Sequence, residues 1–250
     1  MTATMNRRKM IGLCGSAVAW PLAAHAQQRR LLYLTHSAGY RHEAIPVSRT
    51  ILTRISQSSG LFDVTATEDV SQLSTENLAR YAAVMFYTTG ELPMSAAQKG
   101  ALLDFVRSGR GFIGVHSATD TFYEWADYGA LIGGYFDGHP WHQSVRINVS
   151  EPSDALVAFL EPSFEIKDEI YQIRDFDEQG SRVLLRLDGK SVDLSREGVH
   201  QRSYGWPLAW TRSYGQGRVF YTALGHEEAV WRDTRYQRLL LNAIRWSSDC

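Results

Sequence analysis

The chain has 250 residues, with 26 Lys and Arg against 27 Asp and Glu, and 44% of its residues are hydrophobic. This balance is typical of a globular protein and lacks the basic surplus of a dedicated nucleic-acid binder. Only 2 cysteines are present, which excludes a framework of several disulfides, whereas His (8) and Trp (7) are well represented.

Residues 1–26 have the pattern of an export signal. Paired arginines, Arg7 and Arg8, precede an apolar stretch over 10–24, and the Ala-His-Ala sequence at 24–26 is typical of a signal-peptidase site. The paired arginines favour the twin-arginine route over an ordinary secretory signal. We therefore expect a periplasmic or secreted protein that has no membrane association after cleavage.

The mature chain would be residues 27–250, which we expect to form one domain. Cleavage removes three basic residues, leaving 23 against 27 acids and a net charge of about −4. It also removes Cys14, so that Cys250, the last residue, is the remaining thiol. No internal cysteine is then available as a nucleophile.

The first half of the mature chain alternates between strand and helix patterns. Short apolar or alternating runs predict strands, and apolar residues at helical spacing predict helices between them. The predicted strands are 31–35, 62–67, 81–87 and 111–116, and the predicted helices are 43–59 and 95–109. Such an alternation indicates βαβ units around a parallel sheet.

The second half contains amphipathic strand patterns, which favour an antiparallel extension of that sheet. The predicted strands are 144–149, 165–173, 183–187, 208–213 and 218–223, and a helix over 236–246 ends the pattern.

Polar segments follow three of the parallel strands, at 36–42, 88–91 and 116–120. Parallel α/β sheets bind ligands beyond the carboxyl ends of their strands. His116 follows a buried strand directly, where α/β enzymes place a nucleophile elbow, although the Gly-x-His-Ser-Ala order differs from Gly-x-Ser-x-Gly. The alternative interpretation is a loop histidine without a role.

Three further groups of residues are candidates for chemistry. His139 and His142 are three apart, a usable metal-ligand spacing in a turned backbone, although a packed turn is the alternative. In the run 168–171, strand alternation places Glu169 and Tyr171 on one face and Asp168 on the other; a solvated edge strand is the alternative. His226 follows a late strand and faces the same edge, unless it simply begins a helix.

Several tryptophans lie around these segments, and their faces suit the C–H faces of sugar rings, although most such residues in proteins are core. They are Trp125, Trp141, Trp206, Trp210 and Trp231. Neither a G-x-G-x-x-G motif nor a P-loop occurs at a strand–helix junction, so no nucleotide cofactor is expected.

The order of these segments resembles the ThuA-like, or trehalose-utilisation, family over about residues 30–248. The segments that carry the resemblance are YRH (40–42), GRGFIGVHSAT (109–119), GGYFDGHP (133–140), DEIY (168–171), PLAW (207–210) and YGQGRVFYTALGH (214–226).

The resemblance implies a flavodoxin-like three-layer α/β/α sandwich of the class I glutamine amidotransferase type, with antiparallel extension strands in the second half. In amidotransferases an elbow Cys works with a late His and Glu. Here His116 and Ser117 stand at the elbow, and His226 and Glu228 resemble the late pair. Amidotransferase activity is therefore not expected, because there is no thiol to activate.

The resemblance also implies sugar metabolism, including trehalose and related keto-glycosides. We predict a hydrolase or lyase, assisted by a divalent metal such as Zn²⁺ or by acid/base residues, that acts on a small-molecule carbohydrate. The alternative is a non-catalytic carbohydrate-binding or accessory protein on a degenerate amidotransferase scaffold. The oligomeric state is left open.

The predicted site residues fall into three groups. The predicted catalytic residues are His116, His226 and Glu169. The predicted metal ligands are His42, His116, His139 and His226. The predicted substrate-binding residues are Tyr40, Asp120, Trp125, Trp141, Tyr171 and Trp210.

Overall fold

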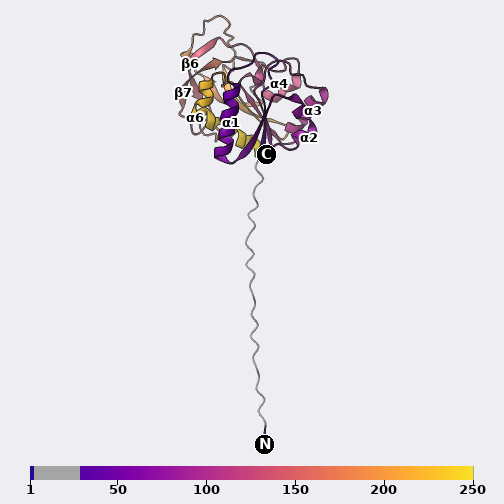
Figure 1. Ribbon diagram of the computed structural model, residues 1–250. Coiled ribbons are helices and arrows are strands. Elements are labelled where there is room, and N and C mark those ends of the chain that lie inside the picture. Colours follow the sequence, from indigo (N-terminus) through magenta and orange to yellow (C-terminus); the bar gives the residue numbers. More distant parts are fainter. Residues whose placement is uncertain (3–28, 250) are drawn as a thin grey trace.

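The computed structural model describes residues 1–2 and 29–249, so all but the first two residues of the predicted export signal lie outside it. A nine-stranded sheet with helices on both faces forms the body of the described chain (Figure 1). Its strand order is β2-β1-β3-β4-β11-β10-β9-β6-β7. Among the described residues, no helix has the length and apolar character needed to cross a bilayer.

The elements alternate in the first half and are mainly strands in the second. The strands are β1 (Arg29–Leu34), β2 (Phe62–Thr67), β3 (Ala83–Phe86), β4 (Gly111–Val115), β5 (Tyr135–Phe136), β6 (Trp141–Val149), β7 (Ser163–Ile170), β8 (Ile173–Arg174), β9 (Ser181–Leu187), β10 (Pro207–Tyr214) and β11 (Gly217–Thr222). The helices are α1 (Ile45–Ser59), α2 (Thr75–Leu78), α3 (Ala96–Arg107), α4 (Ala126–Ile132), α5 (Glu228–Arg232) and α6 (Thr234–Ser248), with 3₁₀ turns η1 (Val70–Leu73), η2 (His116–Thr119) and η3 (Gly189–Ser191).

Five neighbouring strands form the parallel half of the sheet, in the order β2-β1-β3-β4-β11. Every residue of β3 and β4 is buried, which explains their continuous apolar runs. Helices cover both faces: α1 and α6 contact one another on one face, and α3 and α4 contact one another on the other. The predicted three-layer α/β/α arrangement is confirmed.

The other four strands, β10, β9, β6 and β7, continue the sheet with antiparallel pairing, as predicted. The predicted strand over 165–173 was wrong in one respect, because the chain leaves the sheet after Ile170. It then forms the short β8, which pairs with β5 in a separate two-stranded sheet. After this departure the Tyr171 ring packs on that of His116, which follows β4.

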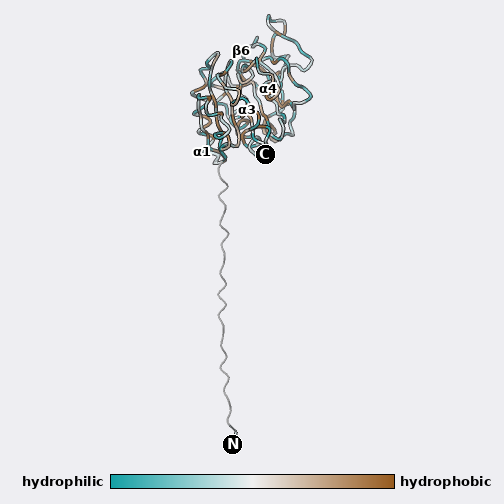
Figure 2. The backbone as a smooth tube through the Cα atoms, turned by 90° about the vertical axis from the view of Figure 1, so that its right-hand side faces the viewer, coloured by the Kyte–Doolittle hydropathy of each residue, from teal (hydrophilic) through white to brown (hydrophobic). Residues whose placement is uncertain are grey.

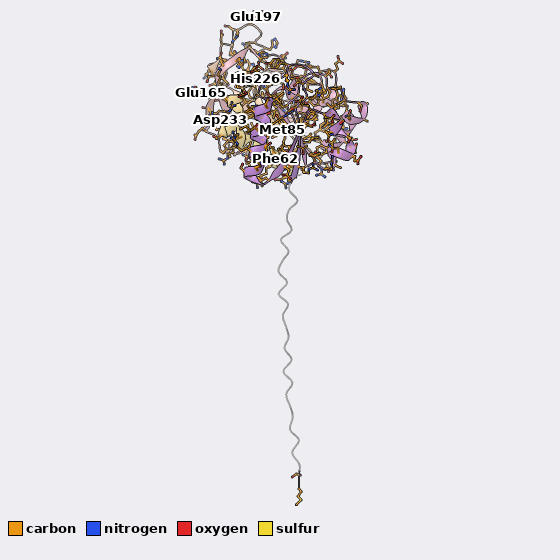
Figure 3. All side chains as sticks on the ribbon, in the orientation of Figure 1. Phe62, Met85, Glu165, Glu197, His226 and Asp233 are labelled. Carbon is orange, nitrogen blue, oxygen red and sulfur yellow. The ribbon has the colours of Figure 1, made fainter. Side chains whose placement is uncertain are left out.

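The apolar core runs along the whole sheet, and Figure 2 shows hydrophobic segments through the middle of the body with hydrophilic segments around them. Figure 3 shows Phe62, at the start of β2, at the lower end of the body and Met85 further up. His226 lies above both, towards the end of the molecule where the parallel strands finish. The candidate site therefore lies at the edge that the sequence predicts.

Candidate functional site

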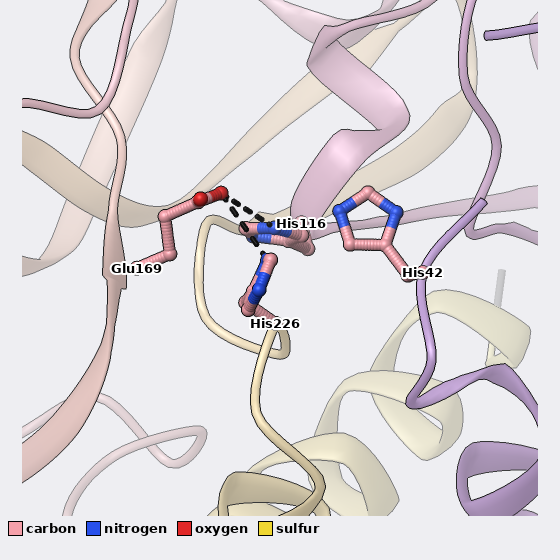
Figure 4. Close-up of side chains that lie close together, drawn as sticks. All are labelled: His42, His116, Glu169 and His226. Carbon is pink, nitrogen blue, oxygen red and sulfur yellow. Dashed lines mark ion pairs between the residues drawn. The ribbon is translucent and has the colours of Figure 1, made fainter. Parts of the chain in front are cut away.

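Four side chains from four separate segments converge beyond the carboxyl ends of the parallel strands (Figure 4). They are His42, His116, Glu169 and His226, and we call them the His/Glu cluster. One nitrogen or oxygen of each lies within 4.8 Å of the corresponding atoms of the other three. The topology explains the convergence, because the loops after β1, β4 and β11 leave the same edge and β7 ends beside them.

His116 occupies the elbow between β4 and η2, with a φ of 45° that only a few non-glycine residues adopt. Its Nδ1 lies 2.7 Å from the carbonyl oxygen of Ala223, and its own carbonyl accepts a hydrogen bond from Tyr221 at 2.7 Å. Because a carbonyl can only accept, Nδ1 carries a proton, and Nε2 is the nitrogen that faces the cluster. This arrangement suits a metal ligand whose second nitrogen is hydrogen-bonded.

Glu169 is the anion at the centre of these histidines. Its Oε2 lies 3.5 Å from His116 Nε2 and 3.2 Å from His226 Nδ1, while Oε1 lies 3.3 Å from His139 Nδ1. Burial opposes ionisation of this carboxyl, but interactions with His116 and His226 outweigh it and hold the pKa of Glu169 well below its usual range. Glu169 is therefore ionised near neutral pH.

His42 supplies a neutral imidazole. Burial, together with electrostatic interactions with His116 and His226, lowers the pKa of His42 to about 2. Its ring meets those of His116 and His226 edge to face, with centroids 4.8 and 5.2 Å away. For His226, burial lowers the pKa, but interaction with Glu169 outweighs burial and raises the pKa overall.

The cluster has the chemistry of a divalent-metal site. His42 Nδ1, His116 Nε2 and His226 Nδ1 are buried without a well-aligned hydrogen bond, and an unpaired buried nitrogen costs free energy. Three imidazoles and a carboxylate are donors that Zn²⁺ accepts, at about 2.0–2.2 Å in tetrahedral geometry. The residues present therefore fit the group by the chemistry of their donor atoms.

His139 and His142, the pair predicted from their spacing, do not act together. His139 contacts Glu169 but lies outside the four-residue metal group. His142 is the second residue of the extended strand β6, whereas His139 lies in the loop before it, and His142 Nε2 lies 2.6 Å from Glu227 Oε1. The structure therefore groups Glu169 with His42, His116 and His226 as the residues that could hold a metal, and His139 lies outside this group.

Two of the predicted substrate-binding residues lie where they can meet a ligand beside the cluster. The Tyr40 side chain is 60% exposed, and its ring is nearly parallel to that of His226 at 6.4 Å. Asp120 is half-buried at the end of η2 and accepts a hydrogen bond from Tyr123 at 2.6 Å. Burial, only partly opposed by that hydrogen bond, raises the pKa of Asp120.

The predicted roles of Trp141, Trp210 and Tyr171 in binding substrate do not fit their positions, because all three are buried. Trp141 and Trp210 donate their indole N–H to the backbone carbonyls of Asp193 and Ile132. The Tyr171 ring packs on that of His116 at 4.1 Å and so supports the imidazole. The burial of Trp141 and Trp210 agrees with the alternative interpretation, in which such tryptophans belong to the core.

Trp125 is half-buried, and the Lys99 ammonium lies 5.1 Å from its ring centre. A cation over the ring competes with a sugar for the same aromatic face. Trp125 is therefore a weaker stacking platform than Tyr40.

Two acidic residues near His226 make their contacts outside the His/Glu cluster. Glu228, which resembles the Glu of the late amidotransferase pair, forms an ion pair with Arg232 one turn along α5, at 2.8 Å. Asp168, set on the opposite strand face from Glu169, is fully buried and accepts hydrogen bonds from the backbone N–H groups of Gly225 and Glu227. The alternation of β7 places Asp168 on the opposite face from Glu169. It does not identify the partner of Asp168, because Gly225 lies 57 positions away in the sequence.

Fold and site together define a glutamine amidotransferase-like α/β protein whose elbow holds a histidine in a His/carboxylate cluster. Neither of its two cysteines, Cys14 and Cys250, lies near the elbow in the sequence. The ThuA family model, described as trehalose utilisation, matches residues 30–247, and the chain belongs to this family. Membership implies a role in trehalose utilisation or sugar metabolism.

Solved structures agree with this assignment. A putative ThuA-like protein from Bacteroides uniformis has 25% identity and a TM-score of 0.72, covering 92% of this chain and 95% of that one. Another from Parabacteroides merdae has 21% identity and a TM-score of 0.71, covering 89% and 91%. A putative GMP synthase subunit from Thermoplasma acidophilum, with 9% identity, a TM-score of 0.52 and 88% and 94% coverage, shares the fold alone. Comparison with curated proteins found no match.

Proposed function

We propose that this protein is an exported, metal-assisted hydrolase or lyase that acts on a glycoside or keto-glycoside of the trehalose-like disaccharide class. The observation that carries the proposal is the His/Glu cluster, in which three imidazole nitrogens without a well-aligned hydrogen bond and one carboxylate converge at the carboxyl ends of the parallel strands. Membership of a trehalose-utilisation family supports the class of substrate.

His42, His116, Glu169 and His226 would hold the ion. A divalent cation bound there supplies Lewis-acid polarisation of a sugar carbonyl and a lowered pKa for bound water. The donor set contains one anion and three imidazoles, which favours Zn²⁺ over the oxygen-seeking Ca²⁺ and Mg²⁺.

The chain's own side chains would position the sugar and move protons. The exposed ring of Tyr40 stands beside His226 and offers an aromatic face to a pyranose. Asp120, whose pKa is raised by burial, is suited to hold a proton for a sugar oxygen. The imidazole of His139 projects towards Glu169 and is 49% exposed, so it connects the carboxylate with solvent.

Metal content is the first test. Protein purified without a histidine tag should carry close to one equivalent of zinc by elemental analysis, or bind one after dialysis. The variants His116→Ala and His226→Ala should each bind zinc at least 100-fold more weakly. His200→Gln is the matched control, because His200 pairs with Asp137 outside the cluster. Equal zinc binding by all four proteins contradicts the metal site.

Turnover is the second test. We expect the zinc-loaded protein to cleave a trehalose-class disaccharide or its 3-keto derivative, and His226→Ala to lower kcat by more than 100-fold. Retention of turnover in both His116→Ala and His226→Ala would exclude the proposed site. Carbohydrate binding without turnover in the wild-type protein would instead favour the accessory-protein alternative.

Export is a separate part of the proposal, and it rests on the sequence of residues 1–26. We expect the mature protein in the periplasmic fraction or the medium, beginning near residue 27. Replacing both Arg7 and Arg8 with Lys should block transport if the twin-arginine route is used. Unchanged transport of that variant would favour the ordinary secretory route.

A further inference from the structure

Asp168 lies next to a proposed metal ligand in β7 but does not face the cluster. Its carboxylate is fully buried. Its Oδ2 accepts a hydrogen bond from the backbone N–H of Gly225 at 2.7 Å, and its Oδ1 accepts one from Glu227 at 3.0 Å. The two donors lie on either side of His226 in the chain, so this single carboxylate fixes the peptide groups Leu224–Gly225 and His226–Glu227.

The carbonyl of Gly225 is held from the opposite direction. It accepts hydrogen bonds from the Tyr87 hydroxyl and from the Trp231 indole N–H, each at 2.8 Å. Gly225 has a φ of 128°, where side chains are strained, and a Cβ at this position would lie 2.9 Å from the Tyr236 hydroxyl oxygen. The segment that carries His226 is therefore held by three buried side chains and has little freedom to turn.

A carboxylate is a costly way to hold a loop, because burying it loses hydration that two neutral hydrogen bonds only partly replace. Its particular advantage is geometric, since two equivalent acceptor oxygens match two backbone donors. An amide offers one acceptor and would direct an N–H₂ group at one of these N–H groups. A buried carboxylate is therefore suited to a place where the position of the intervening side chain must be tightly fixed.

We infer that Asp168 is a positioning residue for the metal site, which holds the segment from Gly225 to Glu227 so that His226 Nδ1 faces Glu169 and the ion. The two acidic neighbours of β7 then have different roles, because Glu169 binds the ion and Asp168 orients a second ligand. The inference rests on the proposed metal site for its function, whereas the orienting contacts themselves are independent of the ion.

The test is zinc affinity of Asp168→Asn, measured by competition with a chromophoric chelator. We expect zinc to bind 10- to 100-fold more weakly, which is the range seen when partners of ligating residues are removed. The matched control is Asp154→Asn, which removes a carboxylate charge away from the cluster but keeps one oxygen for the single backbone N–H that Asp154 binds, that of Leu156. The control should bind zinc as the wild type does. Equal zinc affinity of Asp168→Asn and wild type overturns the inference, whatever the change in Tm.

A second variant keeps the test decisive if Asp168→Asn does not fold. Tyr87→Phe removes one of the two donors to the Gly225 carbonyl and leaves Asp168 intact. Zinc affinity should fall several-fold, and an unchanged affinity in this folded variant would count against the orienting arrangement.

Failure of the metal site itself would be recognised separately, because the wild type would then bind no zinc. The orientation of His226 would be read in that case from the imidazole ¹⁵N chemical shifts of the metal-free protein. Asp168→Asn should shift the His226 signals and Asp154→Asn should not. Unchanged His226 signals would overturn the positioning role on their own.

Discussion

Glu68 ties the loop that carries His42 to the neighbouring loop after β2, and its replacement tests how that loop is held. Its carboxylate accepts two hydrogen bonds from Arg41, both at 2.9 Å, and one from Arg49 at 2.8 Å. Its backbone carbonyl lies 2.8 Å from His36 Nδ1. Glu68→Gln keeps the shape and the backbone contact but removes the charge that both guanidinium groups share.

The expected magnitude follows from the pKa of Glu68. Hydrogen bonds from Arg41, together with its charge and Arg49, outweigh burial and lower the pKa from 4.5 to about 2. At about 1.4 kcal/mol per pKa unit this shift sets a ceiling of roughly 3 kcal/mol. The Glu68 side chain is 40% exposed, so solvent screening reduces the contribution to about 1 kcal/mol.

The direction of the pKa shift of Glu68 determines how the stability of the fold depends on pH. A carboxyl whose pKa is lower in the folded than in the unfolded protein stabilises the fold above pH 4.5, and that stabilisation is lost as the pH falls towards 2. Urea unfolding followed by tryptophan fluorescence should therefore show wild type about 1 kcal/mol more stable than Glu68→Gln at pH 7. The difference should shrink from about pH 4.5 to about pH 3. A difference that is constant over this range, or absent at neutral pH, would refute the assignment.

Three further substitutions separate core from site. Trp210→Phe should lower the free energy of unfolding by about 2–3 kcal/mol, because it leaves a small cavity and an unpaired carbonyl at Ile132, yet leave the KM of an active preparation unchanged. Tyr40→Ala should change that free energy by less than about 0.5 kcal/mol, because the ring is exposed, but raise KM several-fold; an unchanged KM would remove Tyr40 from the binding surface. Gly217→Ala should cost about 3 kcal/mol in urea unfolding, because a Cβ there would overlap the carbonyl oxygen of Val106; a Tm equal to that of wild type would count against this packing.

Much of the fold follows from local patterns in the sequence. The alternation at 62–67 predicts β2 to the residue, and the buried runs predict β3 and β4 within two residues at either end. These strands are specified by apolar residues that are adjacent in sequence, which is the information a periodicity contains. The break after Ile170 was missed because Tyr171 and Ile173 continue an apolar alternation, and tertiary packing on His116 and pairing with β5 decide their path.

The site was predictable as far as the sheet dictates it. Residues that follow parallel strands must meet at one edge, so the grouping of His42, His116 and His226 follows from strand order. Which other residues complete the His/Glu cluster depends on distances in space, and the spacing of residues in the sequence does not give these distances. A strand pattern does not reveal that Glu169 Oε2 lies 3.2 Å from His226 Nδ1, or that the other carboxylate oxygen, Oε1, lies 3.3 Å from His139 Nδ1. Both Tyr40 and Trp210 are aromatic residues near polar segments, and the sequence pattern does not reveal that Tyr40 is exposed whereas Trp210 is buried.

The elbow explains how this scaffold can change its chemistry without changing its backbone. A residue with positive φ directly after a buried strand projects its side chain at the ligand-binding edge, whatever that side chain is. A thiol there needs a neighbouring base to become a nucleophile. The imidazole of His116, fixed through Nδ1 to Ala223, instead directs Nε2 at the cluster, and under the proposed function His226 would be a second donor to the ion. Asp168 and Tyr221 hold the backbone at these two donors, so the rigidity that an elbow nucleophile requires also suits a metal ligand.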